Sequence, residues 1–323
     1  MIGSSFPINR VTKASPSDPE RDPGSAVAIA AFTLVVPGFF AYHVLAGFGL
    51  IPLVLRGYST AIATLVLLPM LFVYVRHALR WGRYTPPVDA LFLGFVAYLV
   101  LVVAIQTLRG APTAITSSHL AIAVQFLALF AIFSLVDIND RRFRALYQLS
   151  FVAMTTIIFA NVSEGSFVVA AIDLGPAEEG QADYQGYAFV YLVTTLFCAV
   201  SLRRVVLRVL VYLLATPALF LNGARSEFLG FLVAILLIEL CITRRRLLVV
   251  AIIAALCVAG AIAVLAFVDM LSNNRVLDLI EYTASDSVSE RREAMVLAWR
   301  TVSESPLLGD YGSYRVEIGR AHV

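Results

Sequence analysis

Charged side chains are scarce in this sequence. Of its 323 residues, 14% are Asp, Glu, Lys or Arg and 60% are hydrophobic, and the mean hydropathy is +0.85. Soluble domains carry about a quarter charged residues, so this composition excludes an ordinary soluble protein and predicts one that crosses a lipid bilayer several times. No basic patch typical of nucleic-acid binding is visible. The expected partner is therefore the lipid bilayer and not a nucleic acid.

Cysteine is also rare. The three cysteines, Cys198, Cys241 and Cys257, fall inside apolar runs and match neither a metal-ligand nor a redox spacing. The sequence therefore predicts neither a disulfide framework nor a metal site built on cysteine.

The start of the chain lacks the short apolar core of a cleaved signal peptide. Residues 1–25 are rich in Ser, Pro and Asp with scattered Arg, a composition typical of a disordered segment. We interpret them as a disordered cytoplasmic tail.

What the sequence does contain is a series of apolar runs, each near the ~20 residues that a membrane span needs. Nine runs predict a transmembrane helical domain at residues 26–269. The first run starts at residue 26, and Pro37 and Gly38 predict a kink in it. The predicted fold is all-α, a polytopic membrane protein with about nine transmembrane helices and an amphipathic helix on its outer face. The later spans are expected at residues 58–78, 88–108, 120–138, 145–161, 187–202, 205–221, 228–242 and 247–269.

The distribution of Arg and Lys predicts the orientation. With the tail in the cytoplasm, fifteen of these residues fall in the tail and the inner loops, and three fall in the outer loops before residue 269. The three are Arg56, Arg109 and Arg225. Because cytoplasmic loops carry the excess of positive charge, the segment at residues 270–316 is expected outside the cytoplasm, where no ATP is available.

Two short polar segments are expected on the outer face. Residues 162–186 contain acidic but no basic residues and are interpreted as a solvated loop, with a general base for an acceptor hydroxyl as the alternative. Residues 222–227 place Arg225 in a tight Gly turn at the membrane boundary, on the side where cations are scarce. Substrate binding and snorkelling to lipid headgroups are both open interpretations of this arginine.

The longest polar run, residues 287–315, is expected to form the amphipathic helix. It begins with a capping-box pattern at Ser287, repeats apolar residues at helical spacing and ends at Pro306. Arg291 and Arg292 stand in its first turn, where a cation costs ~0.3 to 1 kcal/mol against the helix dipole. A bound anion makes the electrostatic energy of the two arginines at this position favourable, so this helix start is a candidate phosphate or diphosphate site. The alternative is an Arg-bearing helix that lies on the membrane surface.

Single ionisable residues in or near the spans are given local roles. Glu239 lies about one turn from Arg244 and is expected to form an ion pair with it, in preference to a proton relay. His43, His77 and His119 stand singly near span ends, where an interfacial role is expected.

Placed in this way, the motifs resemble the O-antigen ligase and polymerase family of multi-span bacterial membrane proteins. The turn NGARSEF is similar to the family's Gly/Ser-Arg-Ser element, with Arg225 on its arginine. The segment RREAMVLAWRTVSESPLLGDYGSYR is similar to the family's outer loop, and its Arg291, Glu293 and residues 306–309 match the pattern. Met295 stands where the family usually has a Trp.

The resemblance implies glycan transfer on the periplasmic face of the bacterial inner membrane, with the N-terminus in the cytoplasm. The donor is an undecaprenyl diphosphate-linked glycan, the acceptor is a glycan or lipid A-core, and no cofactor or metal takes part. Fixed guanidinium groups would stabilise the charge that grows on the leaving diphosphate. Arg225 and Arg291 are the predicted catalytic residues. The further predicted substrate-binding residues are Arg292, Ser226, Gly309 and Tyr311.

Two other functions stay open from the sequence. A transporter or flippase of lipid-linked sugars would also need many spans, but its typical internal repeat or paired broken helices are not visible. A noncatalytic membrane scaffold of a polysaccharide assembly complex would use the amphipathic helix as a docking surface.

The C-terminal end carries its own expectation. The spans that follow the outer loop in the family do not follow it here, so the chain is expected to be truncated and inactive as it stands. Residues 317–323, EIGRAHV, are interpreted as a non-native tail translated from a sequencing adapter. The alternative is that Ala321 and His322 begin the family's His-Asn motif. In the family, the histidine of this motif activates the acceptor hydroxyl, and we assign that role to no residue of this chain.

Overall fold

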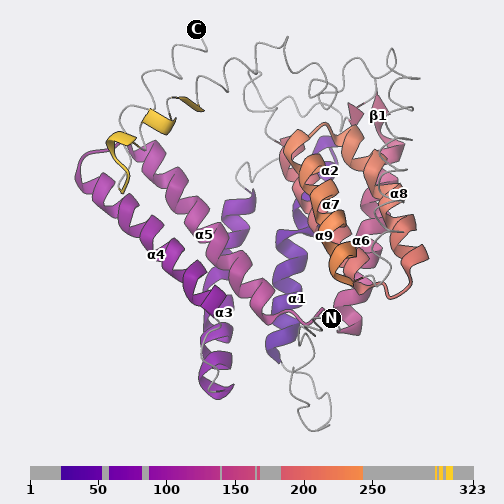
Figure 1. Ribbon diagram of the computed structural model, residues 1–323, viewed down its shortest axis with the longest axis horizontal. Helices are drawn as coiled ribbons and strands as arrows, with labels where there is room; N and C mark the ends of the chain where they lie inside the picture. The colour runs from indigo at the N-terminus through magenta and orange to yellow at the C-terminus, as the bar shows by residue number, and fades with distance from the viewer. Residues whose placement is uncertain are drawn as a thin grey trace, which may run out of the picture.

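The computed structural model describes residues 23–52, 58–81, 87–138, 140–163, 166–167, 183–242, 295–296, 298–300 and 303–307. Figure 1 shows an arrangement of helices with one short hairpin. In chain order the elements are α1 (Pro23–Val35), α2 (Pro37–Gly47), α3 (Tyr58–Trp81), α4 (Pro87–Leu108), α5 (Thr113–Leu135), α6 (Arg141–Ala160), β1 (Val162–Ser163), β2 (Ser166–Phe167), α7 (Asp183–Ser201), α8 (Val205–Asn222) and α9 (Arg225–Ile242).

The helices form two groups that the first pair joins. α3, α4 and α5 pack together, and α6, α7, α8 and α9 form the second group (Figure 1). α1 contacts α3 and α5, whereas α2 contacts α7. Large apolar side chains such as Leu68, Leu91 and Val206 are exposed on both groups, as a surface solvated by lipid chains requires.

A helix occupies each of the first eight predicted span positions. Six helical segments in the described part of the chain are long and apolar enough to cross a bilayer. α7 supplies a shorter apolar helix, Gln185–Ser201, and α9 carries Arg225, Glu227 and Glu239 in its 18 residues. The predicted all-α, polytopic membrane fold is confirmed. The ninth predicted span, residues 247–269, lies outside the described residues.

Two helices begin several residues before the apolar runs that predicted them. α5 begins at Thr113 directly after Pro112, and α6 begins at Arg141. Asp140 caps α6, because its Oδ1 accepts a hydrogen bond from the Arg142 N–H at 2.7 Å. Hydropathy locates the apolar part of a span, whereas capping residues decide where its helix begins.

The first span breaks where Pro37 and Gly38 predict a kink. α1 ends at Val35 and α2 begins at Pro37, because proline lacks the N–H that would continue the helix. The Leu34 carbonyl oxygen, in the last turn of α1, accepts a hydrogen bond from the Tyr58 hydroxyl of α3 at 2.8 Å. This bond satisfies a backbone acceptor that lipid chains cannot satisfy. Gly38 leaves room for this hydroxyl, since an added Cβ would lie 2.6 Å from it.

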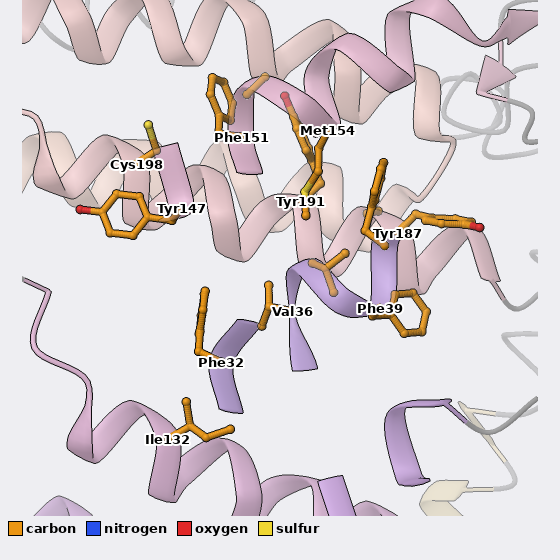
Figure 2. Close-up of a cluster of buried hydrophobic side chains, with 14 of the residues drawn as sticks. Phe32, Val36, Phe39, Ile132, Tyr147, Phe151, Met154, Tyr187, Tyr191 and Cys198 are labelled. Atoms are coloured by element: carbon orange, nitrogen blue, oxygen red, sulfur yellow. The ribbon is translucent and has the colours of Figure 1, made fainter. Parts of the chain in front are cut away.

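Phe32 of α1 lies where the two groups of helices meet. Its ring makes edge contacts with Phe133 of α5, Phe143 of α6 and Phe197 of α7, at centroid distances of 4.8 to 6.2 Å. Figure 2 shows Phe32 in the buried cluster that also contains Ile132 of α5. Such aromatic pairs contribute ~0.5–1.5 kcal/mol each beyond area burial, so the first span helps to hold the two groups together.

Gly186 of α7 lies against the Phe39 ring of α2, and a methyl group there is expected to destabilise the protein. A Cβ added at this position would lie 2.8 Å from Phe39 Cε1. Gly186→Ala should therefore lower the free energy of unfolding by ~1–3 kcal/mol through overpacking, measured by thermal unfolding in one detergent.

The matched control for this prediction is Gly230→Ala in α9, where nothing lies within 4 Å of the added Cβ. Alanine is the better helix former, so the control should keep the wild-type midpoint or raise it. A wild-type midpoint for Gly186→Ala would contradict the close packing of α2 and α7.

Candidate functional site

The predicted arginine turn joins α8 to α9. α8 ends at Asn222, and Gly223 follows with a φ of 75°, in the left-handed region that favours glycine. The Gly223 N–H donates to the Phe220 carbonyl oxygen at 3.1 Å. Because α9 begins at Arg225, the turn reverses the chain in two residues and places this arginine at the first position of a helix.

Arg225 therefore stands at the positive end of the α9 dipole. Its side chain is half-buried, and the neighbouring Ser226 is exposed. The Ser226 hydroxyl donates to Glu227 Oε2 at 2.7 Å, so this carboxylate offsets part of the positive charge. The first N–H groups of a helix have no acceptor within the helix. Together with a guanidinium they form a donor set that suits a phosphate oxygen.

The turn shares one end of the second helix group with the β1–β2 hairpin. α8 contacts β2, and the hairpin follows directly from the end of α6 (Figure 1). Arg141 begins α6 and Arg204 precedes α8, so these two arginines lie at the opposite end. The separation of Arg225 from Arg141 and Arg204 is thus a property of the fold. The side of the membrane on which each end lies stays a prediction.

The other predicted site residues divide between described and undescribed parts of the chain. Ser226 lies in the first turn of α9, beside Arg225. The predicted residues that lie outside the described part are Arg291, Arg292, Gly309 and Tyr311.

Parts of the predicted amphipathic helix are described. Residues 295–296, 298–300 and 303–304 are helical, and a turn follows at Pro306, as predicted. Met295 and Trp299, on the predicted apolar face, are 74% and 75% exposed.

This segment lies beside the first group of helices. The Tyr98 hydroxyl of α4 contacts the Leu307 carbonyl oxygen, and in Figure 1 the segment is drawn near α4 and α5. Arg225 belongs to the second group. The structure therefore does not bring Arg225 together with the described part of the amphipathic helix.

A buried cluster at the other end of α8 and α9 was not predicted. The Arg208 guanidinium forms a two-pronged ion pair with the Glu239 carboxylate, with Nε–Oε1 and Nη2–Oε2 distances of 2.5 and 2.8 Å. The Tyr212 hydroxyl donates to the same carboxylate at 2.9 Å, and Arg208 Nη1 donates to the Leu202 carbonyl oxygen at 3.0 Å. The two charged residues are 2% and 3% exposed.

This cluster bears on two interpretations of the sequence. Glu239 pairs with Arg208 of α8, whereas its expected partner Arg244 lies outside the described residues. Arg208, one of the fifteen residues assigned to the tail and the inner loops, lies inside α8. Residue spacing indicates the Arg208–Glu239 pair, because Arg208 lies 15 residues before Gly223 and Glu239 lies 15 residues after Ala224. Antiparallel helices joined at that turn bring these positions to the same level.

His43 is buried, so its predicted interfacial role is wrong. Its side chain is 2% exposed, and its Nδ1 lies 2.9 Å from the Phe39 carbonyl oxygen. A carbonyl only accepts, so Nδ1 carries the proton. The Tyr58 ring of α3 and the Tyr187 ring of α7 lie 5.8 and 6.1 Å from the imidazole. His119 near the start of α5 is half-buried, and the His77 side chain lies outside the described part.

The predicted outer loop at residues 162–186 begins with a hairpin in which Val162 pairs with Phe167. The Phe167 ring stacks on Phe40 of α2 at a centroid distance of 6.3 Å, so the hairpin packs against the first span. The carboxylates considered as general bases have no described side chains. In the described part of the chain, no three His, Cys, Asp or Glu side chains form a group that could hold a metal ion.

Comparison with known proteins adds one finding to this geometry. The family model described as O-antigen ligase matches residues 210–319, a range that contains both Arg225 and Arg291. No curated protein and no solved structure gives a significant match. The family match supports glycan transfer of the O-antigen ligase kind in general. Residues 210–319 of this multi-pass membrane protein are thus similar to the O-antigen ligase family, as its two arginine motifs predict.

Proposed function

We propose that this protein transfers a glycan from an undecaprenyl diphosphate carrier to an acceptor hydroxyl on the periplasmic face of the bacterial inner membrane. The acceptor is a glycan or lipid A-core. The observation that carries the proposal is the position of Arg225 at the start of α9, inside the range of the family match. There the N–H groups, the helix dipole and the guanidinium together favour binding of one anion.

The proposed reaction requires positive charge at this position. The bond between the anomeric carbon and the diphosphate oxygen breaks, and the acceptor oxygen forms the new bond to that carbon while its proton leaves to a base. Negative charge grows on the departing diphosphate, so a fixed guanidinium stabilises the transition state more than the bound donor. Arginine suits this role because it stays charged and grips phosphate with two parallel hydrogen bonds. The donor is already activated, so no ATP is needed.

The proposed site has two parts. Arg225 and Ser226 form the part at the α8–α9 turn. The Ser226 side chain is exposed there, and we propose that it binds substrate. Arg291 is proposed as the second catalytic arginine. Its contribution, together with that of the neighbouring substrate-binding residues, is supported by the family match and by the residue pattern. The neighbouring residues are Arg292, Gly309 and Tyr311.

Cysteine labelling tests the outer location of the turn. In a variant with the native cysteines replaced, Ser226→Cys should react with a membrane-impermeant maleimide in intact spheroplasts, because Ser226 is exposed at the predicted periplasmic end of α9. Arg203→Cys, at the opposite end of α8 and also exposed, should react only after the membrane is opened. The reverse pattern would place the arginine turn in the cytoplasm and exclude the proposed reaction there.

A further inference from the structure

Asn222, the last residue of α8, has a buried side-chain amide that is not hydrogen-bonded. The residue is 4% exposed. In the described part of the chain, neither its Nδ2 nor its Oδ1 has a hydrogen-bond partner. Buried polar groups in proteins are almost always paired, because leaving a donor or acceptor unpaired in a low-dielectric interior is unfavourable. An amide with both ends unpaired therefore calls for an explanation.

Two other side-chain amides in the described part of the chain are paired. Asn161, which follows α6, is half-buried, and its Nδ2 donates to the Ile157 carbonyl oxygen at 2.8 Å. Gln125 of α5 donates through Nε2 to the Thr60 hydroxyl of α3, also at 2.8 Å. The unpaired amide thus occurs where α8 meets the αL residue Gly223, three residues before Arg225.

The chemistry of the amide restricts what could pair with it. Nδ2 offers two donors and Oδ1 offers an acceptor. An ionised diphosphate only accepts hydrogen bonds, so it could satisfy Nδ2 but not Oδ1. A sugar hydroxyl or acylamino group both donates and accepts, so such a group can satisfy both ends of the amide. In a carrier-linked donor, the sugar is bonded directly to the diphosphate.

We propose that the Asn222 amide binds a hydroxyl or acylamino group on the first sugar of the donor, next to the diphosphate held by Arg225. This inference rests on the proposed function and adds the residue that recognises the sugar. Because the amide is closed off from solvent in this structure, binding includes an opening of the turn at Gly223 and Ala224. A site that pairs its buried polar groups only with the correct sugar discriminates against donors that lack it.

The test compares two lipids on the purified chain in nanodiscs. The probes are undecaprenyl diphosphate and undecaprenyl diphosphate-linked N-acetylglucosamine. Wild type should bind the sugar-bearing lipid about tenfold more tightly than the bare carrier, the factor for one well-made hydrogen-bonded pair. Asn222→Leu should lose this preference while binding the bare carrier within about twofold of wild type.

A second readout separates recognition from a structural role. Leucine has the shape of asparagine without its polar atoms, so Asn222→Leu should raise the apparent unfolding temperature of the unliganded protein. Asn161→Leu is the matched control. It breaks the bond to Ile157, so it should lower the unfolding temperature and leave the sugar preference unchanged. A lower unfolding temperature for Asn222→Leu, or a sugar preference that survives in it, would overturn the inference.

Arg225→Ala distinguishes this inference from the proposed function. If Arg225→Ala loses binding of both lipids while wild type shows no preference for the sugar-bearing lipid, the result supports the diphosphate site and overturns the role of Asn222. If wild type binds neither lipid, or if Arg225→Ala binds both as wild type does, the proposed diphosphate site fails, and the role of Asn222 fails with it.

Discussion

Glu239→Gln is expected to lower the free energy of unfolding by about 3–5 kcal/mol, because it removes the carboxylate charge that pairs with the buried guanidinium of Arg208. Arg208 is 2% exposed, and its guanidinium pairs with this carboxylate through Nε and Nη2. Within a membrane-spanning helix pair, an unpaired charge has no water to solvate it. Thermal or denaturant unfolding in a single detergent measures the loss.

Two matched variants make this prediction specific. Glu304→Gln removes an ion pair with Arg300 of similar distance, 2.8 Å, whose side chains are 73% and 65% exposed, so it should change stability by less than about 0.5 kcal/mol. Replacing both members of the buried pair, with Arg208→Met and Glu239→Leu, should restore most of the lost stability. Equal effects of the two Glu→Gln variants would contradict the burial of the Arg208–Glu239 pair.

Arg225→Ala is expected to lower kcat/KM for glycan transfer by more than about 2 kcal/mol of transition-state stabilisation, roughly 30-fold. The variant removes the guanidinium at the start of α9, where charge develops on the leaving diphosphate in the proposed reaction. Transfer is measured with the protein expressed from its chromosomal gene, in proteoliposomes that contain carrier-linked donor.

Arg225→Lys tests whether geometry matters as well as charge. Lysine keeps the charge but cannot form two parallel hydrogen bonds, so this variant should recover little of the lost rate. The control is Arg204→Ala, which removes an exposed arginine at the opposite end of α8 and should leave kcat/KM near wild type. A wild-type rate in correctly inserted Arg225→Ala would remove this residue from the site.

Local features of the sequence predicted most of the helical architecture. Runs near 20 apolar residues located the helices of the first eight predicted spans, Pro37 located the break between α1 and α2, and Gly223 located the turn before Arg225. Each of these signals acts over one helix or one turn, because it depends on backbone hydrogen bonding and on the thickness of the hydrocarbon layer. Such signals can be detected without knowing which helices pack together.

Features that depend on packing between helices could not be predicted in the same way. His43 is buried because α3 and α7 bring Tyr58 and Tyr187 over it, and neither tyrosine is near it in sequence. Arg208 and Glu239 meet because α8 and α9 are antiparallel and their distances from the turn are equal. The unpaired state of Asn222 likewise depends on what surrounds it. Residue spacing restricts such contacts only after the pairing of helices is known.

Product analysis tests the proposed glycan transfer most directly. The protein is expressed from its chromosomal gene and incubated in proteoliposomes with an undecaprenyl diphosphate-linked glycan and an acceptor. We expect a new glycosidic bond to the acceptor and release of undecaprenyl diphosphate, with no requirement for ATP. We also expect both products to be lost together in Arg225→Ala. Movement of the intact donor across the membrane without bond transfer would indicate a flippase, and an unchanged donor would indicate a scaffold. Either result would contradict glycan transfer as the function of this protein.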